Sequence, residues 1–385
     1  MRRRAISHAR RIARHCAFHA LARSEEKTRR RIVRAPRRIY KGGVFVPTGV
    51  ILAIIIIGLL LLMFGLAAIL IYSYAVRVAY RFFARPQPRP AYDKSPLSID
   101  QSTIFGRGQN WFYSNRMNVL DWQMTAFDGI KLYAYFIPAA KKSTRDVVIL
   151  VHGFNDMPSV MAAYAQLHLE KRDCHILIPH LRAHGMSEGN FVGYGLFDSQ
   201  DLIMWMQYLE TRLGPDIKVI LHGRSMGAAA VLMTAGSGIA PKSLKGVIAD
   251  SSFDALDKQM AFLIKRKYKN QLRPFLLLVQ RVVLKRFGFP IEKASPESVA
   301  SRIKVPVLLF HGTDDKLVPS YMSENIFNRI RAGKRICLIE GAAHVMGYDA
   351  APEKYSAEIE KFRESISDNE WQRLIGRVPS DEEDE

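Results

Sequence analysis

A long apolar run near the N-terminus constrains this 385-residue chain more than any other feature. No charged residue occurs between Lys41 and Arg77, and residues 50–62 are almost entirely branched aliphatic. The apolar core of a bilayer needs only about 20 such residues. The run is too long for a signal peptide, and no small-residue cleavage site follows it. We therefore predict a transmembrane segment over residues 44–76 rather than a buried core helix.

Basic residues are concentrated around this run, mainly before it. The formal net charge of the chain is +20, and residues 1–94 alone carry 20 basic and 3 acidic side chains. The rest of the chain is nearly neutral, so the high overall charge does not indicate a nucleic-acid-binding protein. Arginine dominates residues 1–41, and the positive-inside rule keeps such a basic arm in the cytoplasm. We therefore expect a single-pass protein of the cell membrane whose remaining chain lies outside the cytoplasm.

Composition also predicts how the remaining segments are divided. A linker is expected over residues 77–114, because its sequence Arg-Pro-Gln-Pro-Arg-Pro at residues 85–90 favours a stiff, extended spacer. The acidic end predicts a tail over residues 369–385. Three cysteines occur far apart in the sequence and form no CxxC pair, so we expect neither a metal site nor a disulfide framework, and no cofactor. They are Cys16, Cys174 and Cys337.

Between residues 115 and 368, short apolar runs alternate with amphipathic stretches. An antiparallel hairpin is expected first, over residues 118–125 and 130–137, with its turn at Asp128-Gly129. The following runs are short and unbroken, which is typical of strands buried on both faces of a mostly parallel sheet. They are residues 147–151, 175–178, 218–221, 246–249, 307–310 and 335–339. The pattern predicts an α/β domain with its active site at the carboxyl ends of the strands.

The first chemical motif is Gly223-Arg224-Ser225-Met226-Gly227. It directly follows a predicted strand and precedes a predicted helix over residues 228–235. In that setting a G-x-S-x-G string is typical of a nucleophile elbow, whose glycines permit a sharp turn that projects the serine hydroxyl above the sheet. Alone, such a string is a common loop sequence. Its place between a strand and a helix predicts Ser225 as a nucleophile.

A second motif, Val151-His152-Gly153-Phe154, ends an earlier predicted strand. The oxyanion of a tetrahedral intermediate is stabilised by preorganised N–H donors, for which two backbone groups suffice. The elbow offers the N–H of Met226, and this loop offers the N–H of Phe154. We expect these two groups to form an oxyanion hole.

A nucleophile elbow requires an acid and then a histidine later in the chain. His344 lies in a glycine-containing loop after the last predicted strand, where its imidazole can reach back to the elbow. On this reasoning the acid stays open. Asp314 and Asp315 follow one late strand, Asp250 follows the preceding one, and each can instead be a turn or capping residue.

These motifs together resemble bacterial α/β-hydrolases of the serine aminopeptidase and monoacylglycerol-lipase-like branch, especially membrane-anchored members from Gram-positive bacteria. The resemblance covers roughly residues 115–368 and implies the α/β-hydrolase fold. The family's G-x-x-D-x-x-V-P string places the acid at the position of Asp315. One departure occurs at residues 180–185, His-Leu-Arg-Ala-His-Gly, where the family has Asp before the Leu-Arg pair and Gly before the histidine. That loop neighbours the site, so the departure bears on substrate shape and not on the triad.

The α/β alternation is interrupted over about residues 252–301 by a stretch rich in apolar and cationic side chains. In a hydrolase of this topology, such an insertion forms a helical cap over the active site. We expect Phe262, Leu276 and Val283 to line an acyl pocket under the cap. The alternative is that these side chains simply pack against the core.

The features predict a membrane-tethered serine hydrolase with Ser225, His344 and Asp315 as its triad. We expect it to cleave carboxylic esters, including lipid or lysolipid esters, through an acyl-enzyme. Its partners would be the membrane and an ester substrate, and no feature specifies an oligomeric state. A peptidase or amidase of the same fold and a non-catalytic, membrane-tethered binding module are the alternatives.

Overall fold

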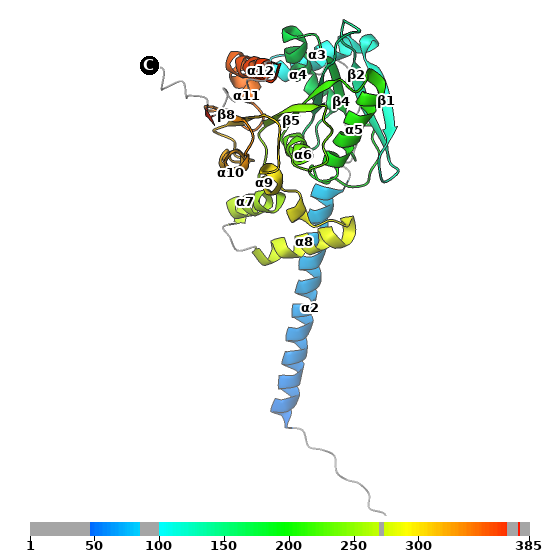
Figure 1. Ribbon diagram of the computed structural model, residues 1–385. Coiled ribbons are helices and arrows are strands. Elements are labelled where there is room, and N and C mark those ends of the chain that lie inside the picture. The colour runs from blue at the N-terminus through cyan, green and yellow to red at the C-terminus, as the bar shows by residue number, and fades with distance from the viewer. Residues whose placement is uncertain (1–46, 85–99, 269–272, 368–375, 378–385) are drawn as a thin grey trace, which may run out of the picture. The chain divides into compact units, whose positions relative to one another are not determined.

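The computed structural model describes residues 47–84, 100–268, 273–367 and 376–377 (Figure 1). The chain divides into two compact units, Met1–Leu66 and Ala67–Glu385. The predicted arm over residues 1–41, the proline-containing segment 85–90 and most of the predicted tail lie outside the described residues.

The apolar run forms one α-helix, α2, over Thr48–Phe83. Its 36 residues extend about 54 Å at 1.5 Å per residue, whereas the apolar core of a bilayer is about 30 Å thick. By length and composition the helix is able to cross a membrane, and its most apolar stretch has no buried residue. It begins at Thr48 rather than at residue 44 and continues to Phe83 rather than ending at residue 76.

The last turns of α2 correct the prediction that a linker begins at residue 77. Within the second unit, Ala75, Ala79 and Phe83 are fully buried. Their spacing of four residues places them on one face of the helix. That face belongs to an apolar cluster with side chains of a later helix, including Val279 and Val283. The chain therefore stays helical to Phe83 because this face is packed against the domain.

The same predicted linker, residues 77–114, also contains helix α3 (Ile104–Ser114). Thr103 caps the start of α3 with its side-chain oxygen. Gly108 approaches another helix so closely that a Cβ atom would overlap the backbone of Ala163. The prediction of a linker is wrong here, because α3 packs onto the α/β domain.

The sheet in the described part of the chain has nine strands in the order β1-β2-β4-β3-β5-β6-β7-β8-β9. The predicted hairpin is present, since β1 and β2 pair antiparallel around Asp128-Gly129. β2 also pairs antiparallel with β4, and all other neighbours are parallel. The strands are β1 (Leu120–Thr125), β2 (Lys131–Ile137), β3 (Asp146–Val151), β4 (His175–Pro179), β5 (Lys218–Arg224), β6 (Leu244–Asp250), β7 (Val307–Gly312), β8 (Lys334–Ile339) and β9 (Gly376–Arg377). The strand β9 falls within the segment predicted as a tail.

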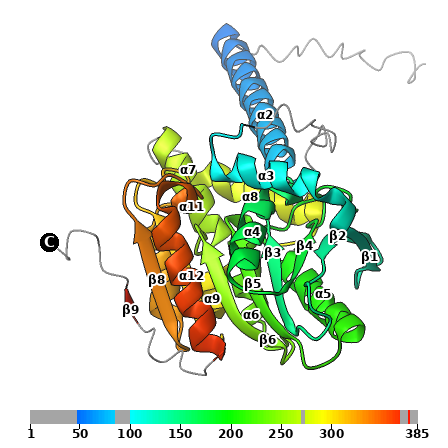
Figure 2. The ribbon, with the colours of Figure 1, turned by 90° about the horizontal axis from the view of Figure 1, so that it is seen from above.

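Helices lie on both faces of this sheet, which confirms the predicted fold class. Figure 2 shows α12 lying over one face. The helices that follow α3 are α4 (Ala162–Lys171), α5 (Asp198–Leu213), α6 (Met226–Ala235), α7 (Leu256–Tyr268), α8 (Arg273–Phe287), α9 (Pro296–Ala300), α10 (Tyr321–Arg329), α11 (Gly347–Ala350) and α12 (Pro352–Ser367).

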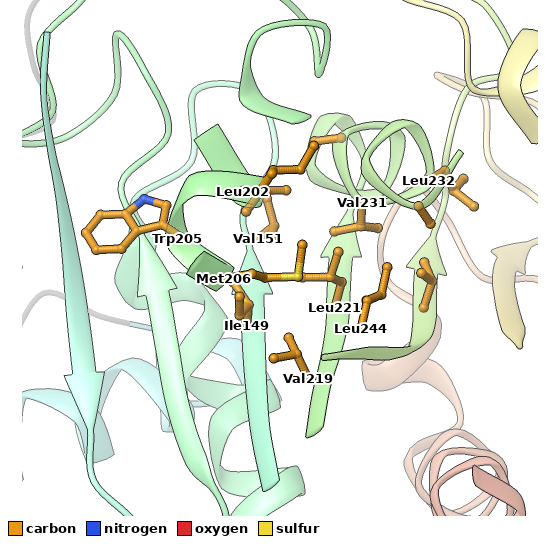
Figure 3. Packing of buried hydrophobic residues seen from close by; sticks show 14 of the residues in the cluster. Ile149, Val151, Leu202, Trp205, Met206, Val219, Leu221, Val231, Leu232 and Leu244 are labelled. Atoms are coloured by element: carbon orange, nitrogen blue, oxygen red, sulfur yellow. The ribbon is translucent and has the colours of Figure 1, made fainter. Parts of the chain in front are cut away.

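Alternate residues of each central strand enter two different apolar layers. On β3, Val147 and Ile149 belong to a cluster with α5 and α6, and Figure 3 shows Ile149 near Met206 of α5. Val148 and Leu150 belong to a second cluster with α4 and α12. Because successive side chains of a strand point to opposite faces, a strand covered on both sides must be apolar throughout. This is why the parallel strands appear in the sequence as unbroken apolar runs.

The interruption over residues 252–301 contains the two helices α7 and α8, followed by the short α9. Apolar side chains of α7 and α8 form a third cluster with the end of α2. Phe83 lies 6.1 Å from Phe287 and 6.0 Å from Phe289 between ring centroids. The helical cap is thus packed on the last turns of α2 as well as on the α/β domain.

Buried histidines should make the folded domain sensitive to acid. Burial lowers the pKa of both His222 and His180 to about 3, whereas histidine in an unfolded chain has a pKa of about 6.5. Below that value the unfolded state binds protons that the folded state excludes. The free energy of unfolding should therefore fall between about pH 6.5 and pH 3, by up to about 1.4 kcal/mol per pH unit for each histidine.

Urea unfolding of the full chain in detergent, followed by tryptophan fluorescence between pH 7.5 and pH 4.5, measures this slope. His222→Gln should give a shallower dependence than the wild type, because it removes one of the titrating groups. An unfolding free energy that stays constant over this range would contradict the prediction.

Candidate active site

The turn between β5 and α6 holds Ser225 in a strained backbone conformation, with φ 53° and ψ −117°. A positive φ is unfavourable for a residue with a Cβ atom. The turn has no space for side chains at its glycines: a Cβ on Gly223 would overlap the carbonyl oxygen of Gly227, and one on Gly227 would overlap that of Val151. The Ser225 N–H donates to the carbonyl oxygen of Asp250 at 2.7 Å. This is the geometry expected of the predicted elbow.

Three side chains from distant parts of the sequence meet at this turn. The Oγ of Ser225 lies 2.9 Å from Nε2 of His344, and Nδ1 of His344 lies 2.6 Å from Oδ2 of Asp315. A carboxylate only accepts hydrogen bonds, so Nδ1 carries the proton and Nε2 is left to accept from the serine hydroxyl. The structure therefore brings together the three predicted triad residues in a continuous relay.

Asp315 is held in place by several donors. Its Oδ1 accepts from the N–H groups of Leu317 at 2.9 Å and Val318 at 2.8 Å. Burial by itself would raise the pKa of Asp315, but the hydrogen bonds from His311 and His344 outweigh it and hold the pKa well below its usual value. The carboxylate therefore stays ionised and keeps its attraction for the His344 imidazole.

His311, near the end of β7, is a further site residue, and no role was predicted for it. Its Nε2 lies 2.7 Å from the carbonyl oxygen of Val318 and 3.2 Å from Oδ2 of Asp315. Both of these atoms are acceptors, so Nε2 carries the proton, and Nδ1 accepts from the hydroxyl of Ser323 at 2.7 Å. The sequence signal for this contact is its spacing. His311 directly precedes the string G-x-x-D that ends at Asp315, so the two residues are four apart.

The other two candidate acids lie elsewhere. Asp314 is exposed and pairs with Lys316 at 3.1 Å. Asp250 is buried, and its Oδ2 accepts from the hydroxyls of Tyr164 at 3.2 Å and Tyr355 at 3.0 Å. Burial and the neighbouring Asp250 raise the pKa of both tyrosines well above its usual value, so both remain donors. Among the three aspartates, Asp315 is the one hydrogen-bonded to His344.

Asp250 supports the loop that carries His344. Its Oδ1 accepts from the hydroxyl of Ser251 at 2.8 Å, and the Ser251 oxygen accepts from the N–H of Val345 at 3.3 Å. Val345 has a positive φ of 56°, which is unfavourable for a β-branched residue. The Asp250 carboxylate thus contributes to the site through the backbone beside His344.

The two predicted oxyanion donors both border the pocket that contains Ser225. In the described part of the chain, the N–H groups of Phe154 and Met226 have no hydrogen-bond acceptor. Met226 is the first residue of α6, where the N–H groups point out of the helix and the helix dipole favours negative charge. A Cβ on Gly153 would lie 3.3 Å from the Cβ of Ser225, so the loop before Phe154 runs against the serine.

Polar side chains hold this loop. The Asp156 carboxylate accepts from the Gly153 N–H at 3.0 Å and lies 3.5 Å from the Nε of Arg224. The Nε2 of His184 accepts from the N–H of Asn155 at 3.1 Å. His184 belongs to residues 180–185, where the sequence departs from the family it resembles, and its contact with the residue after Phe154 was not predicted.

A pocket of about 390 Å³ lies above Ser225. It contains Ser225 and Met226 on the α6 side and is otherwise lined mainly by apolar side chains. The cap contributes Leu256, Gln259, Met260, Leu263, Ile264 and Phe275. None of the residues expected to line it, Phe262, Leu276 and Val283, is in the lining. Phe262 and Val283 pack in the third cluster, and Leu276 is buried. The α-helical period explains the error, because a one-residue shift rotates a side chain by about 100°.

Within the described residues, no group of three or more His, Cys, Asp or Glu side chains is placed to hold a metal ion. Cys174 and Cys337 are both buried, and neither forms a disulfide within the described residues.

The sequence matches the model of the alpha/beta hydrolase family over residues 148–358. It is 27% identical over 250 residues to the uncharacterized protein YqkD of Bacillus subtilis, and the aligned region covers 64% of this chain and 81% of YqkD. It is 24% identical over 250 residues to the uncharacterized protein YfhR of Escherichia coli K12, which covers 64% of this chain and 78% of YfhR.

The fold is similar to that of a solved structure, the esterase Pf2001 of Pyrococcus furiosus. The two superpose with a TM-score of 0.53 at 21% identity, over 76% of this chain and 100% of the Pf2001 chain. The family match covers more than half of the sequence and includes Ser225, Asp315 and His344. On the sequence match and the shared architecture, the chain belongs to the alpha/beta hydrolase family.

Proposed function

We propose that this protein is a membrane-tethered serine hydrolase that cleaves carboxylic esters, including lipid or lysolipid esters. The observation that carries the proposal is the relay from Ser225 to His344 to Asp315 at the base of a mainly apolar pocket. The relay supplies an activated nucleophile, and the pocket supplies a surface for the apolar part of an ester.

In the first half of the reaction, the Ser225 oxygen attacks the ester carbonyl carbon while Nε2 of His344 accepts the serine proton. The carbonyl oxygen becomes an oxyanion, which the N–H groups of Phe154 and Met226 stabilise. Asp315 orients His344 and stabilises its positive charge. When the intermediate collapses, the bond to the alcohol oxygen breaks, and His344 gives its proton to the leaving alcohol.

In the second half, water replaces the alcohol. His344 accepts a proton from the water as its oxygen attacks the acyl carbon, and the same two N–H groups stabilise the second oxyanion. Collapse breaks the bond to Ser225, which regains the proton from His344. The products are a carboxylic acid and an alcohol, and one water molecule is consumed.

An ester is favoured over a peptide by the lining of the pocket. Apart from Ser225, its polar side chains are few, whereas a peptide presents backbone N–H and C=O groups that need partners when buried. A peptidase or amidase would nevertheless use the same relay, and a non-catalytic binding module would keep the pocket alone. These two alternatives have distinct experimental outcomes.

We also propose that α2 crosses the cell membrane with the arm over residues 1–41 in the cytoplasm and the α/β domain outside. The proposal is supported by the length and apolar composition of α2 and by the excess of arginine before it.

Protease added to intact cells should accordingly cleave the C-terminal domain, because the charge asymmetry places it at the outer face of the membrane. The measurement is immunoblotting with antibodies against the domain and against a cytoplasmic marker, in cells whose surface is accessible to the protease. Full protection of the domain under conditions that degrade a known surface protein would contradict this orientation.

A fluorophosphonate probe should label Ser225 covalently in the full chain, because the relay raises the nucleophilicity of its oxygen. Ser225→Ala should abolish labelling, whereas Ser252→Ala, at a buried serine whose hydroxyl donates to the Phe253 carbonyl oxygen, should retain it. Folded protein without labelling would favour a binding module. Labelling combined with turnover of peptides but not of ester or lysolipid panels would favour the peptidase.

The role of Asp315 can be separated from that of its neighbours. Loss of the group that orients the base in a comparable triad costs about 10⁴ in turnover, so Asp315→Asn should nearly abolish ester hydrolysis. Asp314→Asn should cost about tenfold or less, since an exposed turn carboxylate affects stability by on the order of 1 kcal/mol at most. Turnover and thermal midpoint are measured for both variants.

Asp250→Asn is the third member of this series. It removes an acceptor of two buried tyrosine hydroxyls, so it should lower the thermal midpoint. Turnover per folded molecule should change much less than in Asp315→Asn. If Asp315→Asn keeps most of its activity while folded Asp250→Asn loses it, the acid is assigned to the wrong strand.

A further inference from the structure

The end of the apolar helix α2 is part of the wall of the candidate active-site pocket. Five of its residues line the pocket that contains Ser225. They are Tyr74, Val78, Arg81, Phe82 and Phe83. From Tyr74 to Phe82 the helix rises about 12 Å at 1.5 Å per residue. The last turns of α2 therefore form one wall of the pocket.

This part of α2 is joined firmly to the catalytic side of the domain. The carbonyl oxygen of Phe83 accepts from the N–H of Val192 at 2.7 Å, and that of Phe82 accepts from the hydroxyl of Tyr194 at 2.9 Å. The Tyr194 ring contacts Phe83 at 5.2 Å and stacks on Phe154 at 5.4 Å between centroids. One tyrosine thus connects the end of α2 with the proposed oxyanion loop.

The other end of the wall is joined to the cap. Tyr74 stacks on Phe275 of α8 with ring centroids 5.4 Å apart, and Phe275 itself lines the pocket. Between these ends, the small residues Ala75 and Ala79 let α2 approach the cap closely, and both are fully buried. The pocket is consequently enclosed between α2, the cap and the elbow.

The exposure of the lining residues locates the open side of the pocket. Met226 and Leu256 are buried, whereas Tyr74 is 53% exposed and Phe82 is 40% exposed. The pocket is therefore open to the surroundings along α2 at Tyr74 and Phe82, although Phe83 is fully buried, and Leu317 in the lining is also exposed. Arg81, also exposed, is the only charged side chain among the described residues that line the pocket.

The same stretch of α2 has the composition of a membrane–water boundary. Tyr72, Tyr74 and Tyr80 are all exposed, as are Arg77 and Arg81. Tyrosine and arginine are the side chains that favour the level of the lipid headgroups at the end of a membrane helix. Tyr74 and Arg81 belong to both sets, because they line the pocket and have the side chains that favour the headgroup level. In a membrane lipid, the ester lies at the boundary between the apolar chain and the polar headgroup.

We propose that Tyr74–Phe83 of α2 form an acyl-binding wall, and that the substrate is a long-chain ester drawn from the bilayer, with its chain lying along α2. The proposal rests on the serine hydrolase function proposed above and adds a source and a specificity determinant. Val78 and Phe82 are the residues of α2 that set how much of the acyl chain the pocket accepts. A fragment that starts after residue 95 would lack this wall, so the test requires the full chain.

The experiment uses the full chain in phosphatidylcholine nanodiscs and two fluorophosphonate probes, one with an ethyl chain and one with a dodecyl chain. The labelling rate of Ser225 is measured for each. Val78→Trp places a larger side chain in the pocket at the acyl-binding wall. It should lower the ratio of the dodecyl to the ethyl labelling rate by about tenfold or more, as expected for lost methylene contacts in an apolar pocket. Phe82→Ala, at a half-exposed position that tolerates truncation, should lower the ratio in the same direction.

Ser73→Trp is the matched control, because Ser73 is an exposed residue of α2 outside the pocket lining, and its ratio should equal that of the wild type. A ratio unchanged in Val78→Trp and Phe82→Ala, or lowered equally by Ser73→Trp, would overturn the acyl-binding wall. Absence of labelling by either probe in the wild type would instead reject the proposed serine nucleophile.

The source of the acyl chain is tested with nanodiscs that hold both the full-length protein and the dodecyl probe. If the chain enters from the bilayer, the labelling rate should not change when the discs are diluted, because probe and protein share one bilayer. A rate that falls in proportion to dilution would show delivery through water and would overturn the membrane source.

Discussion

The close approach of three backbone segments at the elbow is the constraint on which the site depends. Gly227 lies against the carbonyl oxygen of Val151, and Gly223 lies against that of Gly227. Only glycine fits at both positions, and the result is that β3, β5 and α6 meet with Ser225 at their junction. The strained φ of Ser225 is maintained because the sheet and α6 are packed on both sides. Any side chain that separated these segments would move the serine away from its partners.

Buried polar groups surround this junction and give each member of the relay a defined position. Asp315 is shared between His344 and His311, so its orientation does not depend on the candidate base alone. Asp250, by contrast, acts through Ser251 on the backbone beside His344. The two carboxylates therefore position His344 in different ways. Asp315 contacts its imidazole, whereas Asp250 supports the loop that carries it.

The last turns of helix α2 take part in the packing of the α/β domain. They are buried in the same cluster as the cap and line the pocket above Ser225. A flexible linker at this point would leave the apolar faces of α7 and α8 exposed to water, at a cost of about 25 cal/mol for each Å² of apolar surface. The apolar contacts between α2 and the cap explain why the helix continues to Phe83 instead of ending at residue 76, the predicted end of the transmembrane segment.

Properties that depend on residues close together in the sequence could be predicted from the sequence alone. The apolar run of α2, the unbroken strands and the glycines around Ser225 all reflect local backbone geometry or periodicity, and they predicted the fold class and the elbow. Contacts between distant segments were not readable in this way. The choice of Asp315 over Asp250 required a family resemblance, and the burial of Phe83 in the cluster with the cap had no periodic signal. These contacts join residues whose proximity is created by the packing of the whole sheet and cap, because hydrophobic burial selects which faces meet and a one-dimensional pattern specifies only that a face is apolar.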